Sequence, residues 1–208
     1  MKTKKRLLRR GGTKKNFHMK LKEIYPSCVY DSGTLDRAKY DNFNITYGEM
    51  NYEGIDKLKN HLEKNKKICH HFLDIGSGRG KLCFYMSHDK KYKQIVGIEV
   101  VKERHDDAIK YKDNLKSKYS DRVILLNEDI MKINLQKLFP SAVFVWWSNL
   151  CFHEQDNNNV FNKLLKELPE KSVVCCSKSP SGNIREADEK LSIPMSWSVD
   201  SNILIYYL

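Results

Sequence analysis

The stretch that decides the fold reads Phe72-Leu73-Asp74-Ile75-Gly76-Ser77-Gly78-Arg79-Gly80. Its first four residues are largely apolar, as in a buried strand, and three glycines follow at alternate positions. Glycine adopts backbone conformations that other residues avoid, and it lets a ligand approach the main chain closely. A strand that runs into such a turn and then into a helix predicts a ligand-binding loop at the N-terminus of that helix.

A second predicted strand ends in Glu99, about 20 positions beyond the glycines, where an acidic side chain can accept hydrogen bonds from ribose hydroxyls. The glycine spacing is GxGxG, whereas dinucleotide-binding proteins have GxGxxG. Asp74 would oppose a diphosphate, but it suits a ligand that carries an amino group and a sulfonium. These residues favour S-adenosylmethionine as the cofactor, and a glycine turn of purely structural use is the alternative.

Strand-like and helix-like segments alternate along the chain. Helices are expected behind the cap residue Asn51, at 81–87, at 102–118 and behind the cap-like Asp156. Strands are expected at 72–75, 94–100, 123–126, 142–147, 172–177 and 202–207. This alternation predicts an α/β fold with a doubly wound, mostly parallel sheet and an antiparallel C-terminal strand.

Ligands of doubly wound sheets bind at the carboxyl ends of the strands. Polar side chains lie at four of these ends, and together they indicate one ligand crevice, although each alone could be a turn residue or a helix cap. The four are Asp74, Glu99, Asp129 and Asn149. We expect Asp129 to accept a hydrogen bond from the adenine amino group. We expect the amide of Asn149 to orient a nucleophilic nitrogen of the substrate, with a helix cap as its alternative role.

The net charge of +11 is concentrated at the N-terminus. Of the 37 basic residues, ten lie in residues 1–22 without any acidic residue, which leaves 27 basic against 26 acidic residues in the remainder. Such a segment predicts a disordered basic tail that binds DNA or RNA, with a nuclear-import signal or a solubilising end as alternatives. Residues 23–208 are expected to form a single domain, in which residues 23–50 are a short N-terminal lid segment.

Several classes of protein are disfavoured by what the sequence lacks. The six cysteines form no CxxC pair and match no histidine cluster, so no metal site is expected and an intracellular compartment fits best. No apolar run approaches the roughly 20 residues of a membrane span, so no membrane contact is expected. The tetrad Ser148-Asn149-Leu150-Cys151 lacks the Pro-Pro-aromatic pattern of nucleobase amino methyltransferases, which disfavours base methylation.

Eight short segments of residues 46–208 carry a family pattern. They are Tyr47-Gly48-Glu49, residues 72–81, Gly97-Ile98-Glu99, Glu128-Asp129-Ile130, residues 144–152, Ser177-Lys178, Ser196-Trp197 and Tyr206-Tyr207-Leu208. In this order they resemble the non-SET histone lysine methyltransferases of the disruptor-of-telomeric-silencing type, which have a class I S-adenosylmethionine-dependent (Rossmann-like) fold. FVWWSNLCF resembles that family's Phe-Val-Asn-Asn-Phe-Ala-Phe, with Asn149 on the second asparagine. The chain departs from the family at Met50, where the family has threonine, and at Ile130, where it has an aromatic residue.

The resemblance implies both the site and the reaction. It implies a lysine channel near Asn149, Trp197 and Tyr206, the residues expected to be catalytic, although large aromatics such as Trp197 and Tyr206, taken on their own, are more often core residues. The implied cofactor contacts are Tyr47, Gly48, Glu49, Asp74, Gly76, Ser77, Gly78, Gly80, Lys81, Glu99, Asp129 and Ile130.

The expected function is transfer of a methyl group from S-adenosylmethionine to a histone lysine on nucleosomes, by a monomer. Methylation of RNA or of a non-histone protein is the enzymatic alternative. A chromatin or nucleic-acid-binding module with a vestigial cofactor site is the non-enzymatic alternative. The expected location is the nucleus or chromatin. The Lys-, Asn- and Tyr-rich composition would suit a protist or a large DNA virus, and a viral protein would act in the host nucleus or in a cytoplasmic factory.

Overall fold

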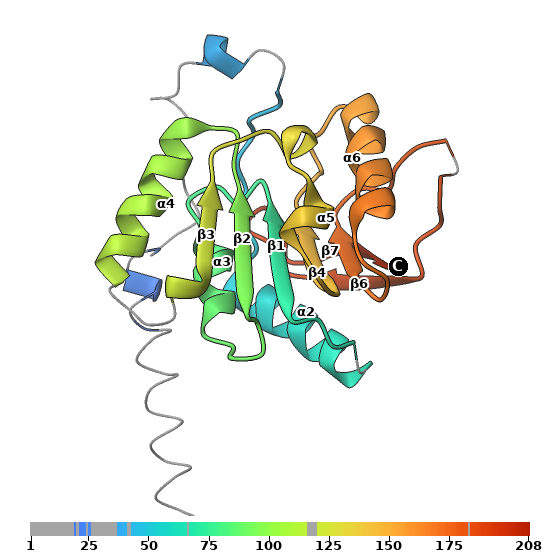
Figure 1. The fold of residues 1–208 in the computed structure, drawn as a ribbon, viewed down its shortest axis with the longest axis horizontal. Helices are drawn as coiled ribbons and strands as arrows, with labels where there is room; N and C mark the ends of the chain where they lie inside the picture. Colours follow the sequence, from blue (N-terminus) through green and yellow to red (C-terminus); the bar gives the residue numbers. More distant parts are fainter. Residues whose placement is uncertain are drawn as a thin grey trace, which may run out of the picture.

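The computed structural model describes residues 19, 21–23, 25, 37–40, 43–65, 67–115, 120–182 and 184–208. Within these residues one sheet has the strand order β3-β2-β1-β4-β5-β7-β6 (Figure 1). The strands are β1 (His71–Ile75), β2 (Gln94–Ile98), β3 (Val123–Leu126), β4 (Val143–Trp147), β5 (Val173–Cys176), β6 (Glu189–Ile193) and β7 (Ser201–Tyr207). The α-helices are α2 (Tyr52–Lys64), α3 (Lys81–Ser87), α4 (Lys102–Leu115), α5 (Leu135–Leu138) and α6 (Glu154–Glu167). The 3-10 helices are η2 (Arg37–Tyr40), η3 (Ser120–Arg122) and η4 (Ile130–Lys132).

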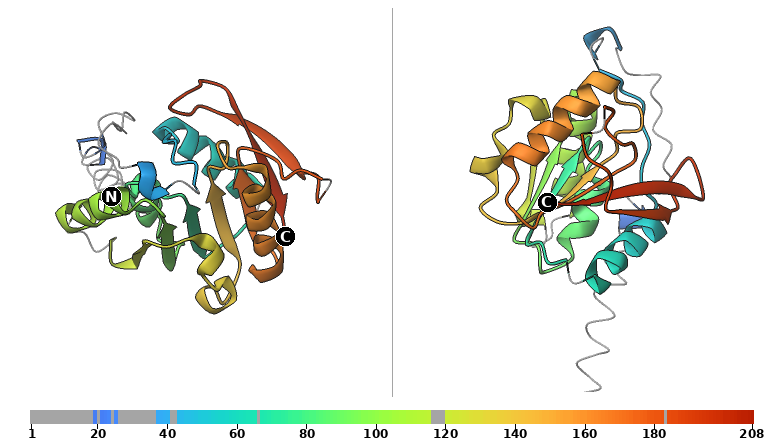
Figure 2. Two further views of the ribbon diagram at one scale, coloured as in Figure 1. Left: turned by 90° about the horizontal axis from the view of Figure 1, so that it is seen from above. Right: turned by 90° about the vertical axis from the view of Figure 1, so that its right-hand side faces the viewer.

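The predicted sheet architecture is confirmed. Strands β1 to β5 pair in parallel, β7 is antiparallel to β5, and β6 is antiparallel to β7. Helices cover both faces of the sheet (Figure 2). Side chains along β1 alternate between two apolar clusters: Phe72 packs with residues of α2 and α3, while Leu73 and Ile75 pack with residues of α5 and α6. This alternation follows from the two-residue period of a strand, and it leaves Asp74 on the α3 side.

Local signals placed most helix and strand ends correctly. Asn51 caps α2 as predicted, because its side chain accepts a hydrogen bond from the Gly54 amide at 2.8 Å. The predicted helix 102–118 is helical to Leu115, and residues 116–119 lie outside the described part of the chain. The cap expected at Asp156 is wrong, because α6 begins at Glu154 and Asp156 belongs to its first turn.

Strand β6 was not predicted from the sequence. Polar and apolar side chains alternate from Lys190 to Ile193, and most of the strand is only partly buried, which is common at the edge of a sheet. Strand β6 pairs with β7 along its whole length and packs against α2. The C-terminal part of the sheet is therefore a hairpin, whereas a single antiparallel strand was expected.

The predicted basic tail lies mostly outside the described residues. Its described part includes Leu21, which is fully buried, and Tyr25 follows it in the same apolar cluster. The Tyr25 hydroxyl donates a hydrogen bond to the backbone carbonyl of Arg79, at 2.6 Å. This end of the basic segment is therefore packed against the glycine loop.

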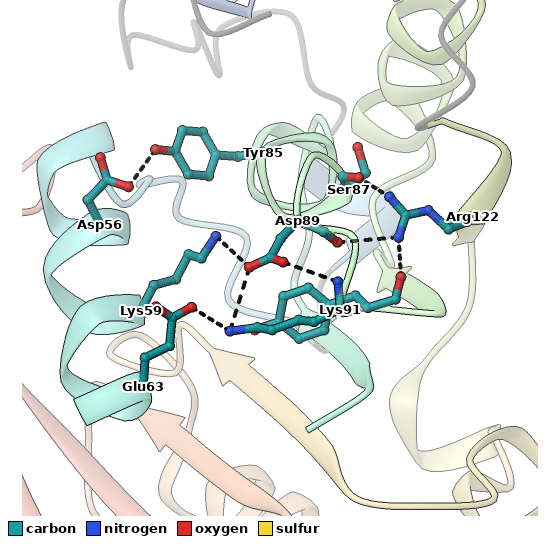
Figure 3. A network of polar contacts seen from close by, with 9 residues as sticks. Asp56, Lys59, Glu63, Tyr85, Ser87, Asp89, Lys91 and Arg122 are labelled. Atoms are coloured by element: carbon teal, nitrogen blue, oxygen red, sulfur yellow. Dashed lines mark hydrogen bonds and ion pairs between the residues drawn. The ribbon is translucent and has the colours of Figure 1, made fainter. Parts of the chain in front are cut away.

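A polar network holds the connection between α3 and β2 (Figure 3). The Arg122 guanidinium donates to the backbone carbonyls of Ser87, Asp89 and Tyr92. Ser87 is the last residue of α3, and the other two lie in the loop that leads to β2. The Asp89 carboxylate forms an ion pair with Lys59 of α2 at 3.1 Å. Because the last carbonyls of a helix lack partners within the helix, Arg122 supplies the donors that this end needs.

We predict that Arg122→Ala lowers the free energy of unfolding by about 1–3 kcal/mol, because part-buried carbonyls lose their donors. Urea denaturation measures the change. Lys110→Ala is the control, since the Lys110 side chain is exposed and its ion pair with Asp107 lies at the surface, and it should change stability by less than about 0.5 kcal/mol. Equal losses in the two variants would contradict the role given to Arg122.

Candidate active site

Two adjoining pockets open at the carboxyl ends of the parallel strands. The wide pocket extends from Glu99, after β2, to Asp129 after β3 and on to the first turns of α6. The narrow pocket lies between the segment Tyr47–Met50, here called the Tyr47 loop, and the start of α3, and it includes Asp74 and Lys81. The residues that line both pockets, and so mark their junction, are Tyr47, Gly48, Gly76 and Ser148.

The glycine loop exposes main chain to the pockets. Gly76 has φ of 76°, and a Cβ added to it would have no atom within 4 Å. Gly78 has φ of 54°, and a Cβ there would lie 2.7 Å from Cε2 of Tyr47. The backbone is therefore open to a ligand at Gly76, while the Tyr47 ring packs directly on Gly78.

Glu99 is buried and connects the glycine loop to the chain after β2. Its Oε2 accepts a hydrogen bond from the Gly78 amide at 2.7 Å, and its Oε1 accepts one from the Val101 amide at 2.8 Å. Burial raises the pKa of the Glu99 carboxyl. A carboxylate oxygen can accept more than one hydrogen bond, so both oxygens remain able to bind a ligand hydroxyl.

The narrow pocket combines two acidic side chains with one basic one. Lys81 Nζ lies 3.0 Å from Oε2 of Glu49, and the Tyr47 hydroxyl donates to the other Glu49 oxygen. Asp74 is buried, and it accepts a hydrogen bond from Cys83 Sγ at 3.6 Å. Burial raises the pKa of Asp74 to about 8, and the nearby Glu99 adds to the shift. This set suits the ammonium and carboxylate groups of an amino acid, and a bound cation would favour the ionised form of Asp74.

The C-terminal hairpin holds the Tyr47 loop in place. The Glu49 amide donates to Oγ of Ser196 at 3.0 Å, and the Ser196 amide donates to the Glu49 carbonyl at 2.9 Å. Beside them Met50 and Met195 form an isolated antiparallel bridge. A Cβ on Gly48 would lie 2.4 Å from the Trp197 ring, so this tryptophan packs directly on the loop.

Arg104 of α4 supports the Tyr47 loop from the other side. Its guanidinium lies 4.8 Å from the centre of the Tyr47 ring, and it donates a hydrogen bond to the Ile45 carbonyl. Only 4% of the Arg104 surface is exposed. A charged residue on a highly charged helix gives no sequence signal of burial, so sequence analysis did not single it out.

Asn149 is fully buried, and all of its hydrogen-bonding groups are used within the protein. Its Nδ2 donates to the Lys178 carbonyl at 2.8 Å and to the side-chain oxygen of Asn157. Its Oδ1 accepts from the amides of Ser177 and Lys178, at 2.9 and 2.8 Å. In this structure the Asn149 amide therefore orients the chain after β5, and it has no N–H left to offer a substrate.

The other two residues expected to be catalytic do not line the pockets. Tyr206 is fully buried against Phe161, with ring centres 4.7 Å apart, and its hydroxyl lies 3.3 Å from Oγ of Ser179. Trp197 is 41% exposed and contacts Gly48. Neither residue lines the two pockets, and Asn149 does not line them either. The expected channel formed by these three side chains is therefore not assembled at the pockets.

A family model described as "Histone methylation protein DOT1" matches residues 25–191. The chain belongs to this family. It is thus a methyltransferase of the S-adenosylmethionine-dependent class, as the resemblance in its sequence implied. A comparison with curated proteins finds no match.

Solved structures agree with the fold of a DOT1-family protein. An RNA methyltransferase from Salinibacter ruber, crystallised with S-adenosyl-L-homocysteine, is 16% identical, with a TM-score of 0.53 over 72% of this chain and 88% of its own. The methyltransferase domain of the bacterial protein CtHen1-CN is also 16% identical, with a TM-score of 0.52 over 74% of this chain and 97% of its own. At such identities the likeness shows the class I methyltransferase fold alone.

The residues at the pockets of this DOT1-family chain fit S-adenosylmethionine. Of the twelve predicted cofactor contacts, eleven line one pocket or the other. The exception, Gly80, begins α3, and a Cβ there would lie 2.8 Å from the Phe84 ring, so Gly80 serves the packing of the helix. Ser148, which lines both pockets, was not predicted, although its place directly after β4 could have indicated it.

Asp129 lies directly before η4. Its Oδ1 accepts a hydrogen bond from the Met131 amide at 2.9 Å, so it acts as the cap of that short helix. Asp129 and the neighbouring Ile130 line the wide pocket. The hydrogen bond expected between Asp129 and the adenine amino group stays a prediction.

The residues that the structure describes include neither a candidate metal site nor a helix that could span a membrane. No group of three or more His, Cys, Asp or Glu side chains is arranged to hold a metal ion there. None of the helices in the same part of the chain combines the length and apolar character needed to cross a bilayer.

We predict that Gly78→Ala weakens S-adenosylmethionine binding at least about tenfold, because the new methyl group displaces the Tyr47 ring from the wall of the narrow pocket. Gly182→Ala is the matched control, since Gly182 also has positive φ, at 76°, but has no atom within 4 Å of an added Cβ. Both variants share a backbone strain of about 1–2 kcal/mol. Calorimetric titration should show a loss of affinity in Gly78→Ala alone.

We predict that the stability of the cofactor-free protein falls between pH 5 and pH 8 because of Asp74. The pKa of this carboxyl is raised to about 8 in the folded protein, so the native state retains a proton that the unfolded chain releases above about pH 4. The stabilisation is complete below pH 4 and is lost as the pH rises through 8. The slope is at most about 1.4 kcal/mol per pH unit.

Asp74→Asn removes this titrating group. The stability of the variant relative to the wild-type protein should therefore rise with pH in urea denaturation series at pH 5, 6, 7 and 8. A difference that stays constant across the series would show that Asp74 is ionised throughout.

Proposed function

We propose that this DOT1-family protein transfers a methyl group from S-adenosylmethionine to a lysine side chain of a nucleosomal histone. The observation that carries the proposal is the family match over residues 25–191. The pockets support it, because the residues predicted to bind the cofactor come together at the carboxyl ends of the strands.

Each part of the two pockets has a separate task in this proposal. Glu99 binds the ribose hydroxyls, and Asp129 with Ile130 borders the adenine. In the narrow pocket Asp74 and Glu49 face the ammonium group of the amino-acid end, and Lys81 faces its carboxylate. When bound, S-adenosylmethionine supplies a methyl group on a positively charged sulfur. A neutral amine can attack the methyl carbon in line with the C–S bond, and the sulfur is the leaving group.

The surroundings of the junction between the two pockets favour a neutral amine. The Tyr47 ring, which lines both pockets, packs on Gly78, and the Trp197 ring contacts Gly48 beside it. Low hydration penalises the charged form of an amine and so lowers its pKa. A lysine nitrogen held beside these rings is therefore more readily available as a nucleophile.

Binding to chromatin is assigned to the basic N-terminal segment. Ten Lys/Arg in residues 1–22 would neutralise DNA phosphates, and this end of the chain joins the domain at Tyr25, beside the glycine loop. The proposed substrate implies that the protein acts at chromatin. We propose that the protein acts as a monomer.

The test is transfer of labelled methyl from S-adenosylmethionine to nucleosomes, free histones and RNA in parallel. We expect label on a histone lysine, most efficiently on nucleosomes at low salt. Transfer to nucleosomes should fall steeply as salt rises, because the phosphate contacts of the basic segment are screened. Gly78→Ala is the low-affinity control.

Each other outcome excludes a part of the proposal. Label on RNA alone would overturn the histone substrate. Undiminished nucleosome methylation at high salt would exclude the basic segment as the anchor. A rise in melting temperature with S-adenosylmethionine, without label on any substrate, would favour the vestigial-site alternative.

A further inference from the structure

Ser148 lies where the two pockets meet. The last pair of the β1–β4 ladder is Ile75 with Trp147, so the next residues along the two strands, Gly76 and Ser148, leave the sheet side by side. Both residues line both pockets. If the wide pocket takes the nucleoside and the narrow pocket the amino-acid end, this junction faces the sulfur between them.

Among the four junction residues, Ser148 has the polar side chain that is available to a ligand. Gly48 and Gly76 have no side chain, and the Tyr47 hydroxyl donates to Glu49. Within the part of the chain that the structure describes, the Ser148 hydroxyl makes no hydrogen bond to protein, and the residue is only partly buried. A Ser148 hydroxyl group in the junction can therefore both donate and accept.

The neighbours of Ser148 hold it rigidly. Trp147 before it is fully buried at the end of β4, and Asn149 after it is anchored through its side chain to the loop after β5. The backbone N–H of Asn149 also donates to the backbone carbonyl of Trp147 at 3.0 Å, and the backbone N–H of Phe152 donates to the backbone carbonyl of Asn149 at 3.1 Å. A group fixed in this way loses little further entropy when it orients a reacting atom.

We propose that Ser148 is a catalytic residue whose Oγ accepts a hydrogen bond from the methyl-accepting amine; this inference rests on the proposed function. A neutral primary amine has two N–H donors and one lone pair, so a bond from one N–H to Oγ leaves the lone pair free. In the transfer, that lone pair forms the new N–C bond while the C–S bond breaks and leaves its electron pair on sulfur. The resulting ammonium group then releases a proton to solvent.

This assignment transfers to Ser148 the role that sequence analysis gave to Asn149. The Asn149 amide is saturated by Asn157, Ser177 and Lys178, so it contributes by positioning the backbone around Ser148. In the segment FVWWSNLCF, Ser148 stands at the first asparagine of the resembling Phe-Val-Asn-Asn-Phe-Ala-Phe. At this position the chain therefore has a shorter side chain that ends in a hydroxyl.

The experiment compares Ser148→Ala, Ser148→Thr and Ser141→Ala in the full chain. Ser141 is an exposed serine just before β4, and its replacement is the matched control. Two quantities are measured: the Kd for S-adenosylmethionine by calorimetry, and kcat and KM for the acceptor that the wild-type protein methylates. We expect Ser148→Ala to lower kcat about tenfold, with Kd changed less than about twofold. Ser148→Thr retains the hydroxyl and should restore most of the activity.

Three results would overturn the inference. Full kcat in Ser148→Ala would show that the hydroxyl does not contact the acceptor. A parallel loss of cofactor affinity would make Ser148 a cofactor contact. Failure of Ser148→Thr to restore activity, with cofactor affinity intact, would show that the hydroxyl is not the group that matters. If the wild-type protein methylates only a hydroxyl group of RNA, the amine contact fails together with the proposed function, and the wild-type assay alone distinguishes that case.

Discussion

The cofactor site depends on one buried carboxylate. Glu99 accepts hydrogen bonds from the amides of Gly78 and Val101, and so joins the glycine loop to the segment that leads into α4. Burying a carboxylate is costly unless its oxygens are satisfied, and here backbone donors on both sides meet that need. The position of Gly78 in turn determines where the Tyr47 ring can pack, because that ring would contact any Cβ added there. The position of Glu99 in the wide pocket therefore affects the position of the Tyr47 ring, which lines both pockets.

The amino-acid end of the site is assembled from distant parts of the chain. Glu49 and Met50 are held by Ser196 and Met195 of the C-terminal hairpin. On α4, the Arg104 guanidinium packs against the Tyr47 ring. These contacts allow the Lys81–Glu49 ion pair to form inside the narrow pocket, at 3.0 Å. Closure of the pocket thus depends on a correctly paired C-terminal hairpin as much as on the glycine loop.

Much of the fold was predictable because its signals are local. The glycine loop, the helix at Lys81–Ser87 and the strand Val123–Leu126 follow from runs of neighbouring residues, and the structure confirms them. Edge strand β6 was not predicted, because it begins with two polar residues and contains only two apolar ones, Leu191 and Ile193, which is too short a pattern to identify a strand. That Asp74, Glu99 and Asp129 lie near one another was also predictable, since parallel strands bring their carboxyl ends to one edge of the sheet. The Tyr47 loop follows none of these strands, and only the family resemblance indicated it.

The sequence by itself determined the doubly wound sheet and the glycine loop, because strand-to-helix periodicity and the glycine spacing act over a few neighbouring positions. It could not determine which polar side chain at the end of β4 is available to a ligand. Asn149 and Ser148 are adjacent, and both types of side chain form hydrogen bonds. Only the tertiary structure shows that Asn157 and the chain after β5 take up every hydrogen-bonding group of Asn149, whereas Ser148 faces the junction of the two pockets. The partners of a buried amide come from distant segments, and no local pattern encodes them.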